Sequence, residues 1–232
     1  MQDLSSAHPE EAVGIIDGMS EPSFVLIIED HPLYKQALMS LLRLSFPENE
    51  ILGYNQAEEA YEFLTAKTDD VKSRSVALLD LSLPGLSGLE LIAKIHTEHP
   101  TLQIAAISGS DDAMRVGACL GAGVSAFISK STPPDRIVDL IGRALRKGLS
   151  EQVWLTIDGQ KNLDEVTQIR LTARQLEVLA LVCKGYSNKQ IADLTQTVEA
   201  TAKAHVSAIL RELGVDNRTQ ALLVAQKLGF KE

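Results

Sequence analysis

Five short apolar runs recur along the first 130 residues, and they limit the fold more than any other feature of the sequence. Each run is continuous and bounded by turn residues, which is typical of strands buried on both faces of a parallel sheet. The stretches between them place apolar residues at helical spacing, as in Leu38, Leu41 and Leu42. Five strands alternating with five helices predict a doubly wound α/β domain. The runs are Phe24–Ile28, Ile51–Tyr54, Val76–Leu79, Ile104–Ile107 and Ala126–Ile128.

The C-terminal part of the sequence carries helical patterns only and predicts an all-α domain of four short helices. Thr172-x-x-Gln175 and Ser187-x-x-Gln190 match the capping box, in which a hydroxyl and a glutamine satisfy backbone N–H groups at the start of a helix. Apolar residues at helical spacing follow both boxes. Two further apolar helical patterns lie beyond them, so we expect the four helices to bury one small core.

The sequence divides into four segments. Its 232 residues exceed the usual size of one small domain and suit two. The stretch between the two domains lacks periodicity and is rich in polar residues, which indicates a linker, with Trp154 packed beneath it. We predict a mobile leader over residues 1–22, the α/β domain over 23–147, the linker over 148–167 and the helical domain over 168–232.

Charge is distributed unevenly between the predicted domains. The chain has a net charge of −9, yet residues 166–232 hold nine Lys or Arg and six Asp or Glu. A mildly basic end on an acidic chain indicates that any nucleic-acid contact is confined to that end, although an excess this small is also expected by chance. The two cysteines fall in different domains, and the sequence has neither a signal-peptide pattern nor an apolar run of the ~18–20 residues that span a bilayer. These features predict a soluble cytoplasmic protein.

Acidic, hydroxyl and basic side chains stand at the ends of four predicted strands. Glu29 and Asp30 follow the first strand, Asp80 ends the third, Ser108 ends the fourth and Lys130 follows the fifth. The carboxyl ends of parallel strands meet at one edge of a doubly wound sheet. Three crowded carboxylates repel one another unless a cation lies among them, and such an oxygen site suits Mg²⁺. A carboxylate beside Mg²⁺ and an ammonium group can attack phosphorus and form an acyl phosphate. Taken singly, the acidic pair is equally typical of a solvated strand end, Asp80 could be a turn residue, and a lone lysine after a strand is usually a surface residue, but their joint placement favours a site.

The third C-terminal helix is predicted to have an apolar face and an exposed face. The exposed face combines small and cationic side chains, which suits insertion into a DNA major groove about 12 Å wide. An ordinary solvated helix face is the alternative interpretation. The exposed residues are Lys203, Ala204, Ser207 and Arg211, opposite the apolar Ala202, Val206, Ile209 and Leu213.

The run from Ile28 to Pro32 and the segment from Leu79 to Glu90, with Ser108 and Lys130, resemble the receiver domain of response regulators of the NarL/FixJ type. The resemblance covers about residues 23–147. It implies that a sensor histidine kinase phosphorylates Asp80 beside a bound Mg²⁺ ion. The roles that it implies are metal binding by Asp30, Asp80 and the backbone carbonyl of Ser82, metal binding through water by Glu29, phosphoryl binding by Ser108 and Lys130, and an aromatic switch at Phe127, where the family often has tyrosine.

Four C-terminal segments resemble the LuxR-type helix-turn-helix domain over about residues 168–230. They are Leu171–Leu179, Gly185–Ala192, Thr201–His205 and Leu213–Arg218. The resemblance implies that the last helix is a dimer surface. It also implies base contacts by Lys203, Ala204 and Ser207 and phosphate contacts by Lys189, Thr201 and Arg218. Val198 replaces the Ser or Thr that commonly caps the recognition helix in this family, and Thr197 is expected to cap it instead.

Together the two resemblances imply a phosphorylation-dependent transcription regulator rather than an enzyme. It is expected to bind double-stranded promoter DNA as a homodimer. One alternative is a phosphoaspartyl phosphatase or mutase, but such enzymes typically place a second acid two residues after the nucleophile, where this chain has Ser82. A second alternative is a DNA-binding regulator that works without phosphorylation and uses its receiver as an interaction module.

Overall fold

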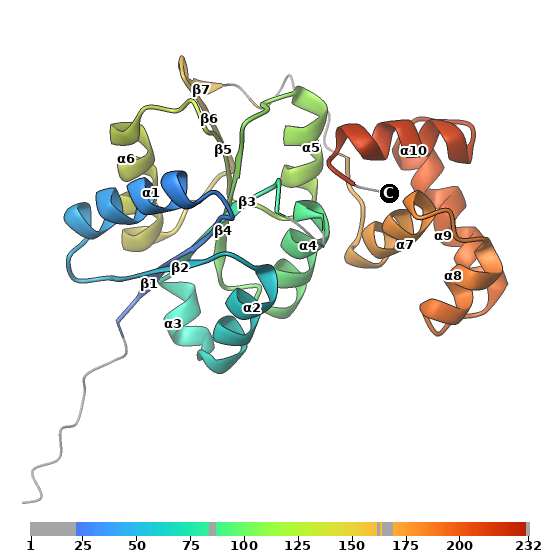
Figure 1. Cartoon of the computed structure of the whole chain (residues 1–232), viewed down its shortest axis with the longest axis horizontal. Helices are drawn as coiled ribbons and strands as arrows, with labels where there is room; N and C mark the ends of the chain where they lie inside the picture. Colours follow the sequence, from blue (N-terminus) through green and yellow to red (C-terminus); the bar gives the residue numbers. More distant parts are fainter. Residues whose placement is uncertain (1–21, 84–86, 162, 164–168, 231–232) are drawn as a thin grey trace, which may run out of the picture.

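The computed structural model of the protein describes residues 22–83, 87–161, 163 and 169–230. These residues form an N-terminal α/β domain and a C-terminal helical domain (Figure 1). The leader predicted over residues 1–22 lies outside the described residues, apart from Pro22. Within the described part of the chain, no helix combines the length and the apolar character needed to cross a bilayer.

A seven-stranded sheet forms the centre of the N-terminal domain, in the order β2-β1-β3-β4-β5-β6-β7. All five predicted strands are present and pair in parallel. Successive side chains of a strand point to opposite faces, so Phe24 and Leu26 pack into one buried layer and Val25 and Ile27 into the other. The bounds are β1 (Phe24–Ile28), β2 (Glu50–Tyr54), β3 (Val76–Asp80), β4 (Gln103–Ser108) and β5 (Ala126–Ser129).

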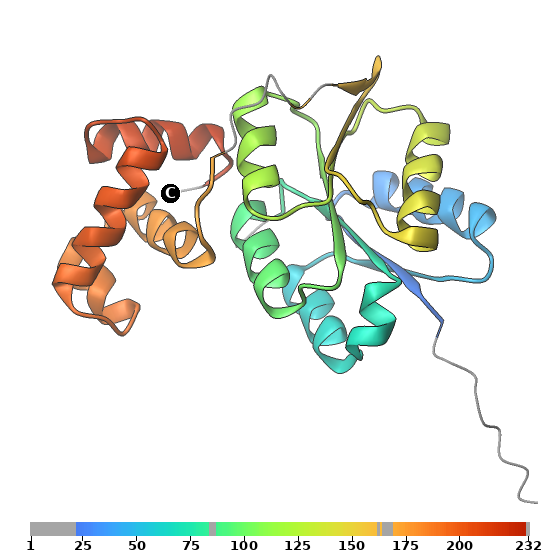
Figure 2. The same ribbon diagram turned by 180° about the vertical axis from the view of Figure 1, so that it is seen from behind.

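Helices cover both faces of this sheet (Figures 1 and 2). Helices α1 and α6 lie on one face, and α2, α4 and α5 lie on the other. The doubly wound architecture predicted from the sequence is confirmed, with one additional short helix, α3, before β3. The bounds are α1 (Pro32–Ser45), α2 (Ala57–Ala66), α3 (Asp69–Ser73), α4 (Gly88–Glu98), α5 (Ala113–Gly121) and α6 (Pro134–Lys147).

Residues 153–161, which the sequence suggests are part of a linker, instead form a β-hairpin that extends the sheet. Strand β6 (Val153–Thr156) runs parallel to β5, and β7 (Gly159–Lys161) runs antiparallel to β6. An edge strand leaves backbone N–H and C=O groups unpaired, and β6 satisfies those of β5. The side-chain amide of Gln152 donates to the carbonyls of Leu120 and Val124, at 2.9 Å each, and so fixes the start of β6.

The C-terminal domain consists of the four predicted helices, and both predicted capping boxes are present. The recognition helix of the sequence analysis, α9, begins without a side-chain cap, because its N-cap residue is Val198. The hydroxyl of Thr197 contacts that of Thr195 at 3.1 Å, so the expectation that Thr197 caps α9 is wrong. The bounds are α7 (Ala173–Cys183), α8 (Asn188–Leu194), α9 (Glu199–Glu212) and α10 (Arg218–Lys227).

The two domains contact each other through α4 and α5 on one side and α7 and α10 on the other (Figure 2). The Arg115 guanidinium in α5 donates to the backbone carbonyl of Lys227 at the end of α10, through Nε at 3.3 Å and Nη2 at 2.9 Å. A Cβ on Gly121 would lie 2.1 Å from the Ile169 carbonyl oxygen, so the chain that enters the C-terminal domain needs a glycine at the end of α5. Buried apolar side chains of both domains form one continuous group, which we call the shared cluster.

Candidate functional site

Lys130 lies between two buried carboxylates at the carboxyl edge of the sheet. Its Nζ is 2.7 Å from Oε2 of Glu29 and 3.0 Å from Oδ2 of Asp80. Asp80 is the last residue of β3, whereas Glu29 and Lys130 follow β1 and β5. The sequence predicted that these three residues meet at one edge of the sheet, and the structure brings them together.

Burial and charge act in opposite directions on these three ionisable groups. Burial raises the pKa of Asp80, and the Glu29 carboxylate adds to this, although the Lys130 hydrogen bond opposes it. Burial also acts to raise the pKa of Glu29, but hydrogen bonds from Lys130 and from the His31 backbone outweigh it, and the pKa is lowered. For Lys130, burial acts to lower the pKa, and its hydrogen bonds to the two carboxylates raise it overall. Glu29 and Lys130 are therefore held as an ion pair, while the charge of Asp80 is the least stabilised of the three.

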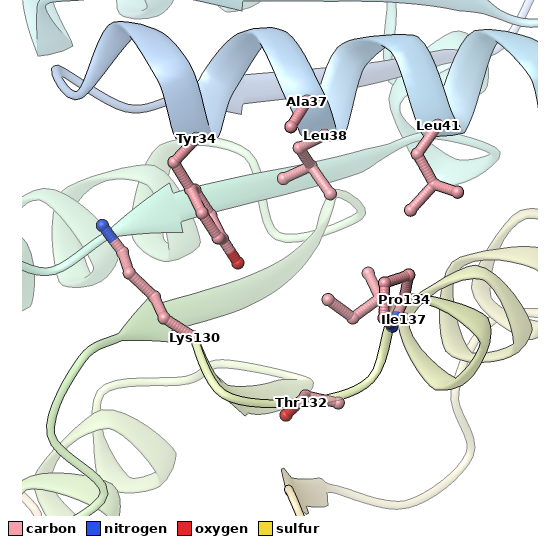
Figure 3. A pocket seen from close by; sticks show the side chains of 8 residues that line it. All are labelled: Tyr34, Ala37, Leu38, Leu41, Lys130, Thr132, Pro134 and Ile137. Atoms are coloured by element: carbon pink, nitrogen blue, oxygen red, sulfur yellow. The ribbon is translucent and has the colours of Figure 1, made fainter.

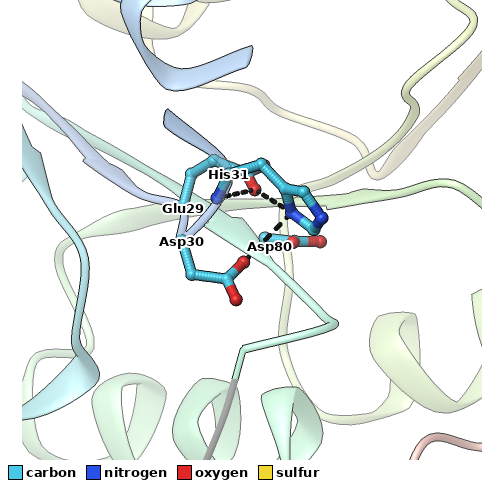
Figure 4. A group of neighbouring side chains, drawn as sticks. All are labelled: Glu29, Asp30, His31 and Asp80. Atoms are coloured by element: carbon cyan, nitrogen blue, oxygen red, sulfur yellow. Dashed lines mark hydrogen bonds and ion pairs between the residues drawn. The ribbon is translucent and has the colours of Figure 1, made fainter. Parts of the chain in front are cut away.

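His31 adds an imidazole to the acidic cluster, a contribution that the sequence analysis did not assign. Its Nδ1 lies 3.0 Å from Oε1 of Glu29 and 3.1 Å from Oδ1 of Asp30 (Figure 4). Pro32 opens α1, and this makes His31 the N-cap residue that turns back toward the strand end. The only sequence signal was its place inside the run from Ile28 to Pro32, which says nothing about the direction of the ring.

The acidic cluster fits a divalent cation. One ligand atom each from Glu29, Asp30, His31 and Asp80 lies within 4.8 Å of the others. Oδ1 of Asp30 is buried, and the polar atom next to it among the described residues is Nδ1 of His31 at 3.1 Å, so this oxygen faces the cluster, where it could serve as a ligand. Carboxylate oxygens are the ligands that Mg²⁺ prefers, and the nearby imidazole nitrogen would also suit a transition metal.

The remaining predicted residues surround this cluster at the strand ends. Ser108, the last residue of β4, is fully buried, and its Oγ accepts a hydrogen bond from the Ser110 N–H at 3.1 Å. The backbone N–H of Ser82 donates to Oδ1 of Asp80 at 3.2 Å and so orients that carboxylate. Phe127 in β5 is fully buried in the shared cluster, on the sheet face covered by α4 and α5.

An apolar groove of about 350 Å³ adjoins Lys130, between α1 and the loop that follows β5 (Figure 3). The Lys130 ammonium lies 4.9 Å from the centre of the Tyr34 ring, a cation–π contact that the sequence analysis missed. The Tyr34 hydroxyl is buried without a hydrogen-bond partner among the described residues, and burial raises its pKa. Tyr34 therefore remains a neutral phenol that supports the stem and charge of Lys130.

The predicted DNA-reading face of α9 is open to solvent. Lys203, Ala204, Ser207 and Arg211 are all exposed, whereas Ala202 and Ile209 are buried against α7 and α8. The receiver-like domain contacts α7 and α10 and leaves this face uncovered. The sequence therefore assigned the two sides of α9 correctly.

The residues predicted to contact phosphate differ in their exposure and in the hydrogen bonds that they already make. Lys189 is exposed on α8, and Thr201 is half-buried in the first turn of α9. The Arg218 guanidinium donates to the carbonyls of Val182 and Tyr186, so it fastens the start of α10 to the end of α7. Lys189 and Thr201 are therefore the better placed of the three to meet a phosphate.

Family comparisons agree with this geometry. The model of the response regulator receiver domain matches residues 25–142, and that of bacterial regulatory proteins of the luxR family matches residues 170–225. The chain is 36% identical to the glycerol metabolism activator of Pseudomonas putida, over 89% of this chain and 96% of that protein. It is 33% identical to the nitrate/nitrite response regulator protein NarP of Escherichia coli (strain K12), over 88% of this chain and 94% of that protein.

The same two-domain fold occurs among solved structures. RcsB from Salmonella enterica serovar Typhimurium, bound to promoter rprA, superposes with a TM-score of 0.52 at 19% identity, over 88% of this chain and 98% of that one. An α/β domain with an acidic strand-edge site, joined to a helix-turn-helix domain, defines a DNA-binding regulator of two-component type. The chain belongs to the NarL/FixJ family of response regulators, whose members carry a receiver domain and a LuxR-type helix-turn-helix domain and act as transcription regulators rather than enzymes.

Proposed function

We propose that a sensor histidine kinase transfers a phosphoryl group to Asp80 of this protein, and that the phosphorylated protein binds promoter DNA as a homodimer in the cytoplasm. The observation that carries the proposal is the Asp80 carboxylate, buried at a strand end with Lys130 Nζ 3.0 Å away and further acids close enough to share a cation. This arrangement supplies a nucleophile and positive charge at the same place.

Asp80 is the nucleophile in the proposed transfer. A carboxylate oxygen of Asp80 forms a bond to phosphorus, the P–N bond of the phosphohistidine breaks, and the released imidazole takes up a proton. Lys130 neutralises charge on the transferred phosphoryl oxygens, and the Ser108 hydroxyl donates a hydrogen bond to one of them. Asp30, Asp80 and the Ser82 carbonyl, with Glu29 through water, would hold Mg²⁺, which supplies the remaining positive charge.

The signal leaves the receiver domain through α10 rather than through α9. The reading face of α9 is exposed, whereas the end of α10 is held by the bond from Arg115 to the Lys227 carbonyl. Helix α10 is also the implied dimer surface, and it presents Leu223, 57% exposed, to solvent. We propose that phosphorylation loosens the hold on α10, so that two copies pair and place two α9 helices on two half-sites.

Labelled acetyl phosphate tests the proposal. With Mg²⁺ present, we expect the wild-type protein to take up about one phosphoryl group, Asp80→Asn to take up none, and Asp139→Asn, an exposed acid on α6, to behave as wild type. DNA binding to genomic fragments is then compared with and without acetyl phosphate. Uptake by Asp80→Asn at the wild-type level would show that the acceptor is another residue. Full uptake with no change in DNA binding would favour the phosphorylation-independent regulator, and continuous release of phosphate would favour a phosphatase.

A further inference from the structure

The β6–β7 hairpin connects the receiver domain to the C-terminal domain, and it is part of the sheet rather than a loose tether. Val153, Trp154 and Leu155 pair in register with Ala126, Phe127 and Ile128 of β5. Beyond β7, the described residues Leu163 and Ile169 pack on the shared cluster. A movement of β5 side chains can therefore reach the C-terminal domain through this hairpin.

Trp154 stands beside the predicted switch residue. Phe127 and Trp154 are direct register partners on neighbouring parallel strands, so their side chains lie on the same face of the sheet, about 4.8 Å apart at the backbone. Phe127 is fully buried and Trp154 is 5% exposed, and both belong to the shared cluster. The interior of a protein is close-packed, so a Phe127 ring that turns toward Ser108 leaves a void that its neighbour must fill.

The hairpin also contacts the loop that carries Lys130. The Thr132 hydroxyl, two residues after Lys130, donates to the Leu155 carbonyl at 3.3 Å. Trp154 and Leu155 are consecutive residues of β6, so one strand touches the aromatic switch and the phosphoryl-binding loop at once.

The indole N–H of Trp154 lacks a hydrogen-bond acceptor among the described residues. This Nε1–H is buried, so the missing bond costs free energy that a leucine or phenylalanine would avoid. The Lys161 ammonium from β7 lies 4.8 Å from the centre of the same ring and shields it from solvent. A buried side chain whose donor has no acceptor breaks no hydrogen bond when it moves, whereas a fully hydrogen-bonded one must break at least one.

We propose that Trp154 is a positioning residue through which Phe127 acts on the hairpin and hence on the C-terminal domain. The inference rests on the proposed phosphorylation of Asp80. When Asp80 is phosphorylated, the buried Phe127 ring turns toward Ser108, Trp154 follows, and β6 shifts with it. Phosphoryl transfer itself does not require Trp154, because Trp154 is the register partner of Phe127 on the neighbouring strand and is not part of the acidic cluster.

Trp154 is the single tryptophan of the chain, so its fluorescence reports on this position alone. We expect acetyl phosphate with Mg²⁺ to shift the emission maximum of the wild-type protein. The shift should disappear in Phe127→Leu, which still takes up labelled phosphate. Ile157→Ser, at the exposed turn of the hairpin, is the matched control and should retain both uptake and shift.

A second set of variants separates signalling from packing. Trp154→Leu should take up phosphate as the wild-type protein does. Acetyl phosphate should no longer raise its affinity for DNA, so the ratio of the DNA affinity with acetyl phosphate to that without it should fall to about one. Trp154→Phe, which keeps an aromatic ring, should restore most of that ratio.

The outcomes distinguish the two proposals. Absence of phosphate uptake by the wild-type protein would overturn the proposed function and this inference with it. Normal uptake with an unchanged wild-type emission spectrum, or with an equal shift in Phe127→Leu, would overturn the role of Trp154 alone. The role of Trp154 would also be overturned if acetyl phosphate raised the DNA affinity of Trp154→Leu as much as that of the wild-type protein.

Discussion

At the scale of single residues, a second group of ionisable side chains lies buried at the edge where the strands begin, opposite the Asp80 edge. Lys72 Nζ lies 3.1 Å from Nδ1 of His99, and both residues are 5% exposed. An ion pair at 3.3 Å joins the same ammonium to Asp69. Burial lowers the pKa of His99, and the Lys72 charge lowers it further, so both disfavour the protonated form of this imidazole.

Stability should therefore depend on pH through His99. The folded-state pKa lies below the unfolded value of ~6.5, so below that pH the unfolded chain binds more protons than the folded one. The contribution of His99 is fully present above about pH 6.5 and is lost as the pH falls toward the folded-state pKa. We expect the urea concentration at the unfolding midpoint to decrease as the pH is lowered from about 7.5 to about 5.5.

Replacement of this histidine isolates its contribution. The urea midpoint of His99→Gln should depend less steeply on pH over that range than the midpoint of the wild-type protein. His96→Gln, an exposed histidine one turn earlier in α4, should leave the dependence unchanged. Equal pH profiles for all three proteins would show that His99 titrates normally.

The acidic residues of the candidate site could be predicted because their positions follow from topology. A residue that ends a parallel strand must lie at the carboxyl edge, whatever its rotamer, so Glu29, Asp80 and Lys130 were expected to meet. The contributions of His31 and Tyr34 could not be foreseen. They depend on how α1 leaves the strand end and on which way two rings point, and neither is encoded in spacing.

At the scale of elements, α9 carries a prediction about DNA reading. Lys203→Ala removes an exposed cation from the proposed reading face, so discrimination between a selected duplex and a scrambled one should weaken by about 1–3 kcal/mol. The selected duplex is taken from a random library with the phosphorylated wild-type protein, and affinities are measured by fluorescence anisotropy at fixed salt.

Lys189→Ala provides the contrasting variant. This exposed lysine on α8 is expected to meet phosphate, so its loss should weaken both duplexes equally and reduce the slope of log affinity against log salt by about one. If Lys203→Ala instead lowered both affinities equally, Lys203 would be a phosphate contact and not a base contact.

The elements themselves were predictable to different degrees. The five apolar runs gave each of the first five strands to within one residue at either end, because continuous burial on both faces leaves an unmistakable pattern. The hairpin of β6 and β7 was missed for a physical reason. Its strands are four and three residues long, too short for periodicity, and β6 forms only because β5 offers a free edge.

At the scale of the whole molecule, the contact between the domains lay beyond sequence analysis. Arg115 reads as an ordinary solvated side chain of a helix, and its acceptor is a backbone carbonyl 112 residues away. Backbone acceptors are present at every position, so no residue type marks them in a sequence.

Removing this contact should loosen the two domains. Arg115→Ala deletes the hydrogen bonds to Lys227, worth about 1 kcal/mol together at a solvent-exposed site, which is roughly a fivefold change in a docking equilibrium. We expect a larger radius of gyration by small-angle X-ray scattering and a higher DNA affinity of the unphosphorylated protein.

Arg143→Ala, an exposed arginine on α6 at the far side of the sheet, is the matched control and should alter neither measurement. A compact Arg115→Ala protein with unchanged affinity would mean that the apolar shared cluster holds the domains without help from Arg115.

The uncovered face of α9 has a consequence for how such a regulator finds its targets. Sequence-independent encounters with DNA need only accessible cations, and Lys203 and Arg211 are already exposed on α9 in this structure, in which Asp80 carries no phosphoryl group. One copy can therefore slide and hop along DNA in the resting cell. On the proposed mechanism, phosphorylation would then set how long a pair of copies stays at an operator, rather than whether any copy ever visits it.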